Sequence, residues 1–145
     1  MSTHPGDETC YGCGAENADG LRMTFVRTGA TSVESEYRVP RHLCGSPAVV
    51  HGGVQATILD EVMGKAAHTA FEGEDRRRIV TAHFALTYRR PAPMAATLTV
   101  RGELVRVDGL NVFVSGALLG PDGTLLTTAE ARWRVIEAAP DATED

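Results

Sequence analysis

The sequence predicts an α+β domain in which a curved antiparallel sheet of about six strands wraps around one long central helix. Segment 53–71 has the apolar periodicity and the length of a helix. The other regular segments alternate in the manner of half-buried strands. Connections between them are short, which favours a single antiparallel sheet, and the helix is the one element that can cover its apolar face.

Two strands are expected before the helix, at residues 21–26 and 33–39. Apolar residues take alternate positions in the first strand, and a proline follows the second. A glycine-containing turn between them makes the pair a hairpin. Residues 41–50 contain glycine, serine and proline, and we expect a loop that leads to the helix.

The helix is expected to run from about Gly53 to Phe71 and to end near Gly73, because glycine suits the left-handed conformation that closes many helices. Its apolar side chains fill one broad arc and its polar side chains fill the opposite one. Asp60 falls at the border between the two arcs. A carboxylate there should face a groove or an interface rather than open water.

Four strands should follow the helix as a meander, at residues 79–88, 97–107, 111–119 and 124–136. Two prolines in residues 89–93 end the first of them, because proline cannot donate to the strand ladder. Glycine-containing turn signals separate the other three. Strand edges that stay open in one chain should be covered by a second copy.

Composition indicates one domain, since the chain has 145 residues and is 43% hydrophobic. We expect a flexible, turn-rich N-terminal segment at 1–20, the domain at 21–137 and a disordered acidic tail at 138–145. The net charge of −5, with both signs interspersed, gives no basic field for nucleic acid. Because the sequence lacks a membrane span and a signal-peptide pattern, we expect a soluble cytoplasmic protein without a membrane partner.

The three cysteines, an odd number without secretory context, argue against a disulfide framework. Cys10 and Cys13 have the spacing of half a zinc site, which Cys44 with His4 or His42 would complete. The sequence has no second C-x-x-C pair. Reduced thiols in a glycine-rich turn are therefore favoured over a zinc site or a thioredoxin-like redox pair, and we expect no metal and no cofactor.

Segment 51–61, H-G-G-V-Q-A-T-I-L-D-E, combines a titratable ring, two glycines and two carboxylates. Glycines let the main chain approach a ligand, and the first amides of a helix lack partners within it, so this end can hold an oxyanion or a polarised carbonyl. His51 is a candidate base, but a ring that fixes the glycine turn is the favoured role. The glycine end and the aspartate end of this segment lie about two helical turns apart, roughly 11 Å, which is too far to act on one carbonyl unless two copies meet.

Four segments, taken together, resemble one known family. They are C-Y-G-C-G-A-E-N-A-D-G-L-R-M at 10–23, the segment 51–61, V-T-A-H-F-A-L-T-Y-R-R-P at 80–91 and D-G-T-L-L at 122–126. In this order and spacing they resemble the hotdog-fold acyl-CoA thioesterases, specifically the phenylacetate-pathway-like (PaaI-type) subgroup. The resemblance implies a hotdog fold and hydrolysis of an acyl- or aryl-acyl-CoA thioester to free acid and CoA.

The resemblance also assigns roles to four residues. Asp60 corresponds to the family's nucleophile or general base, and Thr81 to a hydroxyl that positions the carboxylate or a water. Gly52 corresponds to the glycine whose amide polarises the thioester carbonyl, and His51 to the histidine that supports this turn. The family's active site is shared across a dimer, so the Gly52 of one subunit should work with the Asp60 of the other in a homodimer or homotetramer.

Further residues are expected to contact substrate: Gly53, Gly45, Glu61, Met63, Phe84, Arg89 and Arg90. Gly45 stands where several members of the family carry an asparagine or glutamine. Glu61 points into the polar arc, either solvated or supporting Asp60. Arg89 and Arg90 either bind the phosphates of coenzyme A or form a solvated surface, and the same holds for residues 76–78.

Two other functions stay open from the sequence. A non-catalytic acyl-CoA or small-ligand binding protein of the same fold is the main alternative. A hydratase or dehydratase would need an aspartate and a histidine a few residues apart. The nearest histidine after Asp60 is His68, eight residues on, which disfavours that function.

Overall fold

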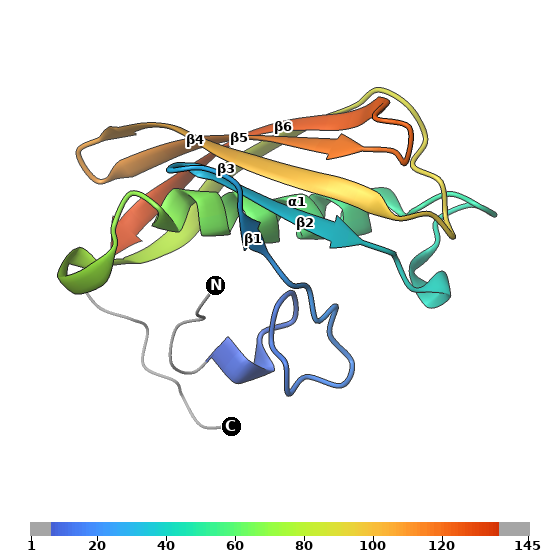
Figure 1. Ribbon diagram of the computed structural model, residues 1–145, viewed down its shortest axis with the longest axis horizontal. Helices are drawn as coiled ribbons and strands as arrows, with labels where there is room; N and C mark the ends of the chain where they lie inside the picture. Colours follow the sequence, from blue (N-terminus) through green and yellow to red (C-terminus); the bar gives the residue numbers. More distant parts are fainter. Residues whose placement is uncertain (1–6, 137–145) are drawn as a thin grey trace.

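One α-helix and six strands make up residues 7–136, the part of the chain that the computed structural model describes (Figure 1). The strands are β1 (Val26–Arg27), β2 (Ser32–Tyr37), β3 (Arg78–Tyr88), β4 (Leu98–Asp108), β5 (Asn111–Leu119) and β6 (Leu125–Ile136). The helix is α1 (Gly52–His68), and short 3-10 helices lie at η1 (Asp7–Thr9), η2 (Arg41–Leu43) and η3 (Gly73–Asp75). A curved antiparallel sheet wraps around the helix, so the expected fold class is confirmed. The tail expected at 138–145 lies outside the described residues, as do residues 1–6.

The strand order, β1-β2-β4-β5-β6-β3, differs from the expected meander of four strands. β4, β5 and β6 do form a meander, but β3 pairs with β6 at the far edge of the sheet. The cause is the connection after β3, which pairs with the loop before α1: Val50 donates its amide to Ala92, and Met94 donates its amide to Ala48. The connection therefore crosses the sheet instead of forming a hairpin, and β3 becomes an edge strand beside the helix.

The first expected strand is shorter than predicted, because β1 holds two residues only. The Leu21 amide donates to the Tyr11 carbonyl, and the Met23 amide donates to the Gly12 carbonyl. Residues before β1 thus pair with the N-terminal segment and not with β2. Leu21 and Met23 are buried in the core all the same, which explains the alternation in the sequence.

α1 ends three residues before the predicted end. The Thr69 amide bonds to the carbonyls of Ala66 and Ala67, and its hydroxyl donates to the Ala66 carbonyl at 2.6 Å. These contacts satisfy the last carbonyls of the helix. Gly73 does have the left-handed conformation, with φ of +62°, but it lies in η3 and does not close the helix.

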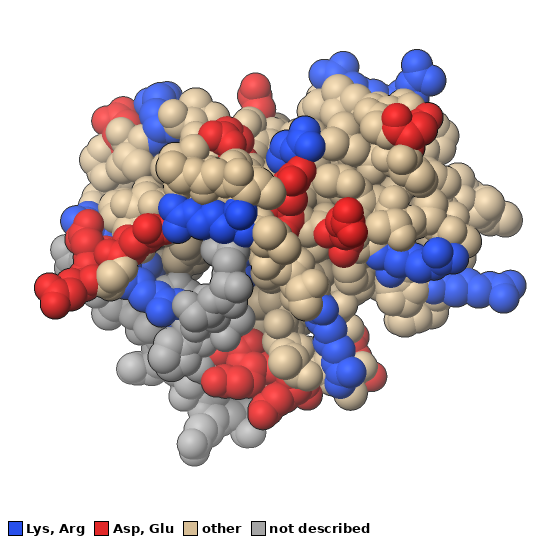
Figure 2. Space-filling view, viewed as in Figure 1, with Lys and Arg blue, Asp and Glu red and all other residues tan. Residues whose placement is uncertain are grey.

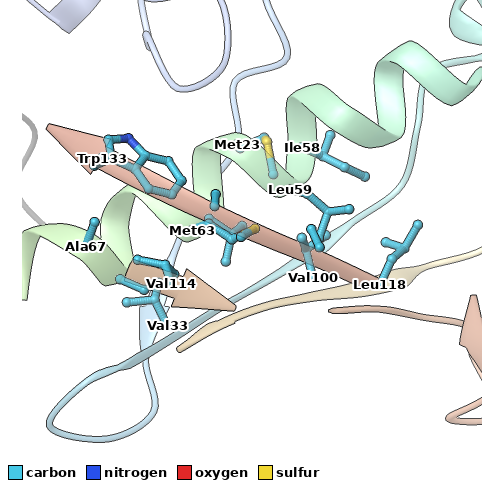
Figure 3. Close-up of a cluster of buried hydrophobic side chains, with 14 of the residues drawn as sticks. Met23, Val33, Ile58, Leu59, Met63, Ala67, Val100, Val114, Leu118 and Trp133 are labelled. Carbon is cyan, nitrogen blue, oxygen red and sulfur yellow. The ribbon is translucent and has the colours of Figure 1, made fainter. Parts of the chain in front are cut away.

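The core lies between α1 and the concave face of the sheet (Figure 3). Leu59 and Met63 from the helix are fully buried there. Two glycines, Gly102 on β4 and Gly116 on β5, are paired directly beneath the helix. A Cβ on Gly102 would lie 3.0 Å from the Val62 carbonyl oxygen, so the missing side chain lets the helix approach closely. This close packing fixes the position of α1 on the sheet.

Positive and negative side chains are interspersed on the face of the molecule that Figure 2 shows. Within residues 7–136, no helix combines the length and apolarity needed to cross a bilayer. The longest helix there is α1, with 17 residues, and its polar flank is covered by other parts of the chain.

Candidate active site

The first turn of α1 is capped by the histidine that precedes it. His51 accepts the amide hydrogen of Gly53 on Nδ1 at 3.0 Å, and its backbone carbonyl accepts from the amides of Val54 and Gln55. Within residues 7–136 the Gly52 amide has no hydrogen-bond partner. His51 therefore fixes the turn, and the Gly52 amide is left at the positive end of the helix dipole, where it can donate to an oxygen.

Tyr88, at the end of β3, holds the same turn from the outside. Its hydroxyl donates to the Gly52 carbonyl at 2.7 Å, and its ring lies 3.5 Å from the position that a Cβ on Gly52 would take. The side chain is 52% exposed, so it covers the turn on the solvent side. Tyr88 lies in segment 80–91, but its role could not be predicted from the sequence, because this contact joins residues 36 positions apart.

Gly45 lies against the backbone of His51. Its amide donates to the Val49 carbonyl at 2.9 Å, and a Cβ on Gly45 would lie 3.1 Å from His51 Cα. A larger residue would press on the turn that carries the Gly52 amide, which accounts physically for glycine at this position. Gly45 also lines a cavity of about 820 Å³, together with Arg38 and Arg41. These two arginines were not among the residues predicted from the sequence, because the cavity that they share forms only in the fold.

Asp60 lies on α1 eight residues after Gly52 and is half-buried. Thr81 on β3 donates its hydroxyl to Asp60 Oδ1 at 2.8 Å. Burial raises the pKa of the Asp60 carboxyl, and the hydrogen bond from Thr81 opposes that rise. The two residues that the resemblance paired are therefore in direct contact.

A β-bulge in β3 lets Thr81 and Tyr88 both point toward α1, where Thr81 contacts Asp60 and Tyr88 contacts Gly52. Thr81 lies opposite Trp133 and His83 lies opposite Arg132, so Ala82 is an extra residue. Thr81 and Tyr88 are seven positions apart, and in a regular strand they would point to opposite faces. The bulge restores the face, so Thr81 reaches Asp60 while Tyr88 reaches the first turn of the helix.

Glu61 is half-buried, so the solvated position considered for it is wrong. The N-terminal segment covers it: a Cβ on Gly12 would overlap the Glu61 side chain, and Cys10 Sγ lies 4.0 Å from Glu61 Oε1. Burial raises the pKa of the Glu61 carboxyl, the charge of Asp60 raises it further, and Lys65 opposes the rise. The other thiol of this segment is also perturbed, because burial and a hydrogen bond with Cys10 raise the pKa of Cys13 to about 12.

Asp60 and Glu61 line a cavity of about 260 Å³ bounded by α1, β3, β6 and the N-terminal segment. Lys65, His68, Arg78 and Trp133 line it as well. Trp133, which is 3% exposed, forms a buried part of the cavity wall. The carboxylate of Asp60 therefore faces a cavity that is partly open to solvent, in agreement with the groove expected from its place on the helix.

The remaining candidates lie in several places. Met63 is fully buried in the core above Gly116, so within this chain it contacts core side chains. Phe84 is half-buried on the helix-facing side of β3. Arg89 Nε donates to Thr128 Oγ1 at 3.2 Å, and Arg90 is exposed beside it. The structure thus gathers the candidates into a group at the first turn of α1 and a second group around Asp60.

A curved antiparallel sheet wrapped around one helix is the hotdog fold of the thioesterases. The family model described as the thioesterase superfamily matches residues 48–127, and the chain belongs to this superfamily. The matched region contains both groups of candidate residues except Gly45. The expected family is therefore confirmed.

A curated relative is the acyl-coenzyme A thioesterase THEM4 of Rattus norvegicus, which is 34% identical over 100 residues. That match covers 69% of this chain and 40% of THEM4, and the chain spans less than half the length of the curated relatives it matches. A crystal structure of a thioesterase superfamily protein is 29% identical, with a TM-score of 0.77 over 88% of this chain and 60% of that one.

Two further solved structures show the fold. The PaaI protein of the phenylacetic acid degradation operon of E. coli has a TM-score of 0.74 at 13% identity, over 86% of this chain and 89% of that one. A hypothetical thioesterase of Streptococcus pneumoniae, whose crystal structure contains coenzyme A, has a TM-score of 0.70 at 17% identity, over 79% of this chain and 85% of that one.

Proposed function

We propose that this protein hydrolyses an acyl- or aryl-acyl-CoA thioester to the free acid and CoA, with Asp60 as nucleophile or general base. The observation that carries the proposal is the hydrogen bond from Thr81 to Asp60 beside a cavity. It holds one carboxylate oxygen and leaves the other for the substrate carbonyl or for a water. The name of the rat relative and the coenzyme A in the pneumococcal structure support the substrate class.

The Gly52 amide is the proposed donor to the thioester carbonyl oxygen. Negative charge builds on this oxygen as the carbonyl is attacked, and a fixed amide at a helix N-terminus stabilises it. His51 and Tyr88 hold the turn and so fix the direction of this amide. No rearrangement is then needed while the charge develops.

A complete site requires two chains in this proposal. Gly52 and Asp60 are eight residues apart on one straight helix, about 12 Å along its axis, too far to act on the same carbonyl. β3 is an edge strand with a free side, and Val80 on it is 39% exposed. Pairing of two β3 edges would cover this surface and bring the Gly52 of one subunit toward the Asp60 of the other, in a homodimer or a dimer of dimers.

Four arginines near the first turn of α1 are proposed to bind the phosphates of CoA. Arg38 and Arg41 line the cavity beside Gly45, and Arg89 and Arg90 follow Tyr88 on the chain. None of the four forms an ion pair within residues 7–136. Guanidinium groups without a carboxylate partner are available for bidentate contacts to phosphate.

Replacement of Asp60 by asparagine tests the proposal. Asn can still accept the Thr81 hydrogen bond, so the change removes the charge and keeps the contact. Asp60→Asn should abolish CoA thiol release over a panel of acyl- and aryl-acyl-CoA substrates and leave the oligomer unchanged in size-exclusion chromatography. Glu36→Gln, at an exposed carboxylate of β2, is the control. An undiminished rate for Asp60→Asn would place the catalytic role elsewhere.

A second candidate, a non-catalytic acyl-CoA binding protein, is favoured by one observation. Gly45 provides no amide side chain at the position where several family members carry one, and the close approach to His51 leaves little room for a substitute. Thermal stabilisation of the wild-type chain by acyl-CoA without thiol release would support this candidate. Release of the thiol by the wild-type chain would exclude it.

A further inference from the structure

Three side chains that can bind a metal converge where the N-terminal segment crosses α1. Cys10 and Cys13 come from that segment, and Glu61 comes from the helix, about 50 residues later in the sequence. One ligand atom of each lies within 4.8 Å of the other two. Cys13 is buried, and the other two side chains are half-buried. The proposed hydrolysis uses none of the three.

We propose that Cys10, Cys13 and Glu61 form a Zn²⁺ site with two thiolates and one carboxylate as protein ligands. Zn²⁺ binds sulfur at about 2.3 Å and carboxylate oxygen at about 2.0–2.2 Å in a tetrahedron, which places the ligand atoms about 3.5–3.8 Å apart. The three atoms are near that spacing already, and inward shifts of about 1 Å or less would complete it. The fourth position faces the cavity of about 260 Å³ and is open to a water.

The turn that carries the two cysteines is held in this shape by backbone contacts. Gly14 donates its amide to the Cys10 carbonyl at 2.9 Å, which closes the turn and keeps the two sulfurs close. Tyr11 and Gly12 accept the amides of residues 21 and 23, so the turn is also tied to the following segment. A cysteine pair on a fixed turn loses little conformational freedom when a metal binds, which favours binding.

Gly12, between the two cysteines, allows the Glu61 carboxylate to approach the turn, because it has no side chain. A side chain there would overlap Glu61, so the close approach of helix and turn depends on this glycine. The contact places a half-buried carboxylate beside two thiols. A thiol is a weak hydrogen-bond donor, and a divalent cation is a far stronger partner for the Glu61 oxygen.

The charges around the site favour a cation. The cavity beside the site is lined by three carboxylates and two cations, so the acidic groups outnumber the basic ones: Asp7, Asp60 and Glu61 against Lys65 and Arg78. Lys65, one turn after Glu61, is the cation nearest in sequence, and its Nζ lies over the ring of Phe25, 5.3 Å from the centroid. Lys65 forms no ion pair within the described residues, so Glu61 is not neutralised by direct contact. Two thiolates and one carboxylate leave the bound zinc with one net negative charge, which Lys65 offsets.

The alternative chemistry for this pair is a disulfide between Cys10 and Cys13. A disulfide would leave Glu61 half-buried against two sulfurs that no longer donate, and burial without a partner is costly for a carboxylate. Zinc instead uses all three side chains. It would also fasten the N-terminal segment to α1, one residue away from Asp60.

The test uses the whole 145-residue chain, reduced and stripped of metal with a chelator, and then titrated with Zn²⁺ or with Co²⁺ as a spectroscopic probe. One equivalent of metal per chain should bind. Co²⁺ should give thiolate charge-transfer absorption, and X-ray absorption of the zinc form should show two sulfur neighbours at about 2.3 Å. A wild-type chain that binds neither metal, or that binds zinc without sulfur neighbours, would overturn the proposal.

Variants separate this site from other thiols. Cys10→Ser and Cys13→Ser should each weaken zinc binding by at least about 100-fold, and Glu61→Gln by at least about 10-fold, since even groups that only support ligands cost that much. Cys44→Ser, at an exposed cysteine elsewhere, is the matched control and should bind zinc as the wild type does. Unchanged affinity in a Cys10→Ser/Cys13→Ser double variant would refute the site.

Thermal unfolding shows whether each variant is folded and whether Zn²⁺ stabilises it. Zn²⁺ should raise the unfolding temperature of the wild type and of Cys44→Ser, and it should not raise that of the double variant. If the thiols instead form a Cys10–Cys13 disulfide that saturating Zn²⁺ does not prevent, the redox alternative holds and the zinc site is refuted. None of these measurements involves thioester hydrolysis, so they stand or fail independently of the proposed function.

Discussion

The contact between Thr81 and Asp60 gives the sharpest test of the proposed chemistry. Thr81→Val keeps the shape of the side chain and removes the hydroxyl that donates to Asp60 Oδ1 at 2.8 Å. A hydrogen bond to a charged group contributes about 1.5–3 kcal/mol. Thr81 is exposed in the single chain, so the low end applies, and about 1.4 kcal/mol corresponds to tenfold in rate. We expect kcat to fall roughly tenfold.

The assay is continuous release of CoA thiol, with kcat and KM measured separately over the acyl-CoA panel. Thr81→Ser keeps a hydroxyl at the same place and is the matched variant, expected within about threefold of the wild type. Circular dichroism and size-exclusion chromatography show whether fold and assembly survive. The reasoning fails if Thr81→Val retains the wild-type kcat, or if Thr81→Ser loses as much as Thr81→Val, because the hydroxyl would then have no part in positioning Asp60.

Three further predictions concern the turn and the packing of α1. Tyr88→Phe removes the hydrogen bond to the Gly52 carbonyl, and kcat should fall about 2- to 10-fold with little change in KM; a change confined to KM would contradict a role in holding the turn. Gly102→Ala pushes a methyl group against the backbone of α1 and should lower the free energy of unfolding by about 1–3 kcal/mol, measured by chemical denaturation. An unchanged free energy of unfolding would show that the helix can move away. Gly64→Ala adds a Cβ that lies at an ordinary 3.6 Å from Trp133, and alanine favours a helix over glycine, so the free energy of unfolding should rise by about 0.5–1 kcal/mol. A lower free energy of unfolding would mean that the methyl group does not fit beside the indole.

The elements of the fold were predictable because each has its own local pattern. The helix and the strands β3 to β6 lie within a few residues of their predicted ranges, since apolar periodicity and turn residues mark them. The place of β3 in the sheet was not predictable in this way. It depends on hydrogen bonds between the connection after β3 and residues 48–50, and a short segment gives no sign of such contacts.

The bulge in β3 left a trace in the sequence. Before Ala82 the helix-facing residues are Ile79 and Thr81, and after it they are Phe84 and Tyr88, so the alternation changes parity inside one strand. That change is the expected mark of one extra residue. Which residue is extra depends on the partner strand β6, and the sequence does not contain that pairing.

The adjacent residues Asp60 and Glu61 show what helical geometry omits. They point about 100° apart, and that angle alone placed Asp60 at a groove and Glu61 in the polar arc, either solvated or supporting Asp60. In the structure both are half-buried, because β3 covers the side of Asp60 and the N-terminal segment covers the side of Glu61. The two neighbouring carboxylates are therefore covered by different parts of the chain. It follows that Asp60→Asn should remove thioester hydrolysis and keep zinc binding, while Glu61→Gln should weaken zinc binding and leave the Thr81–Asp60 contact intact.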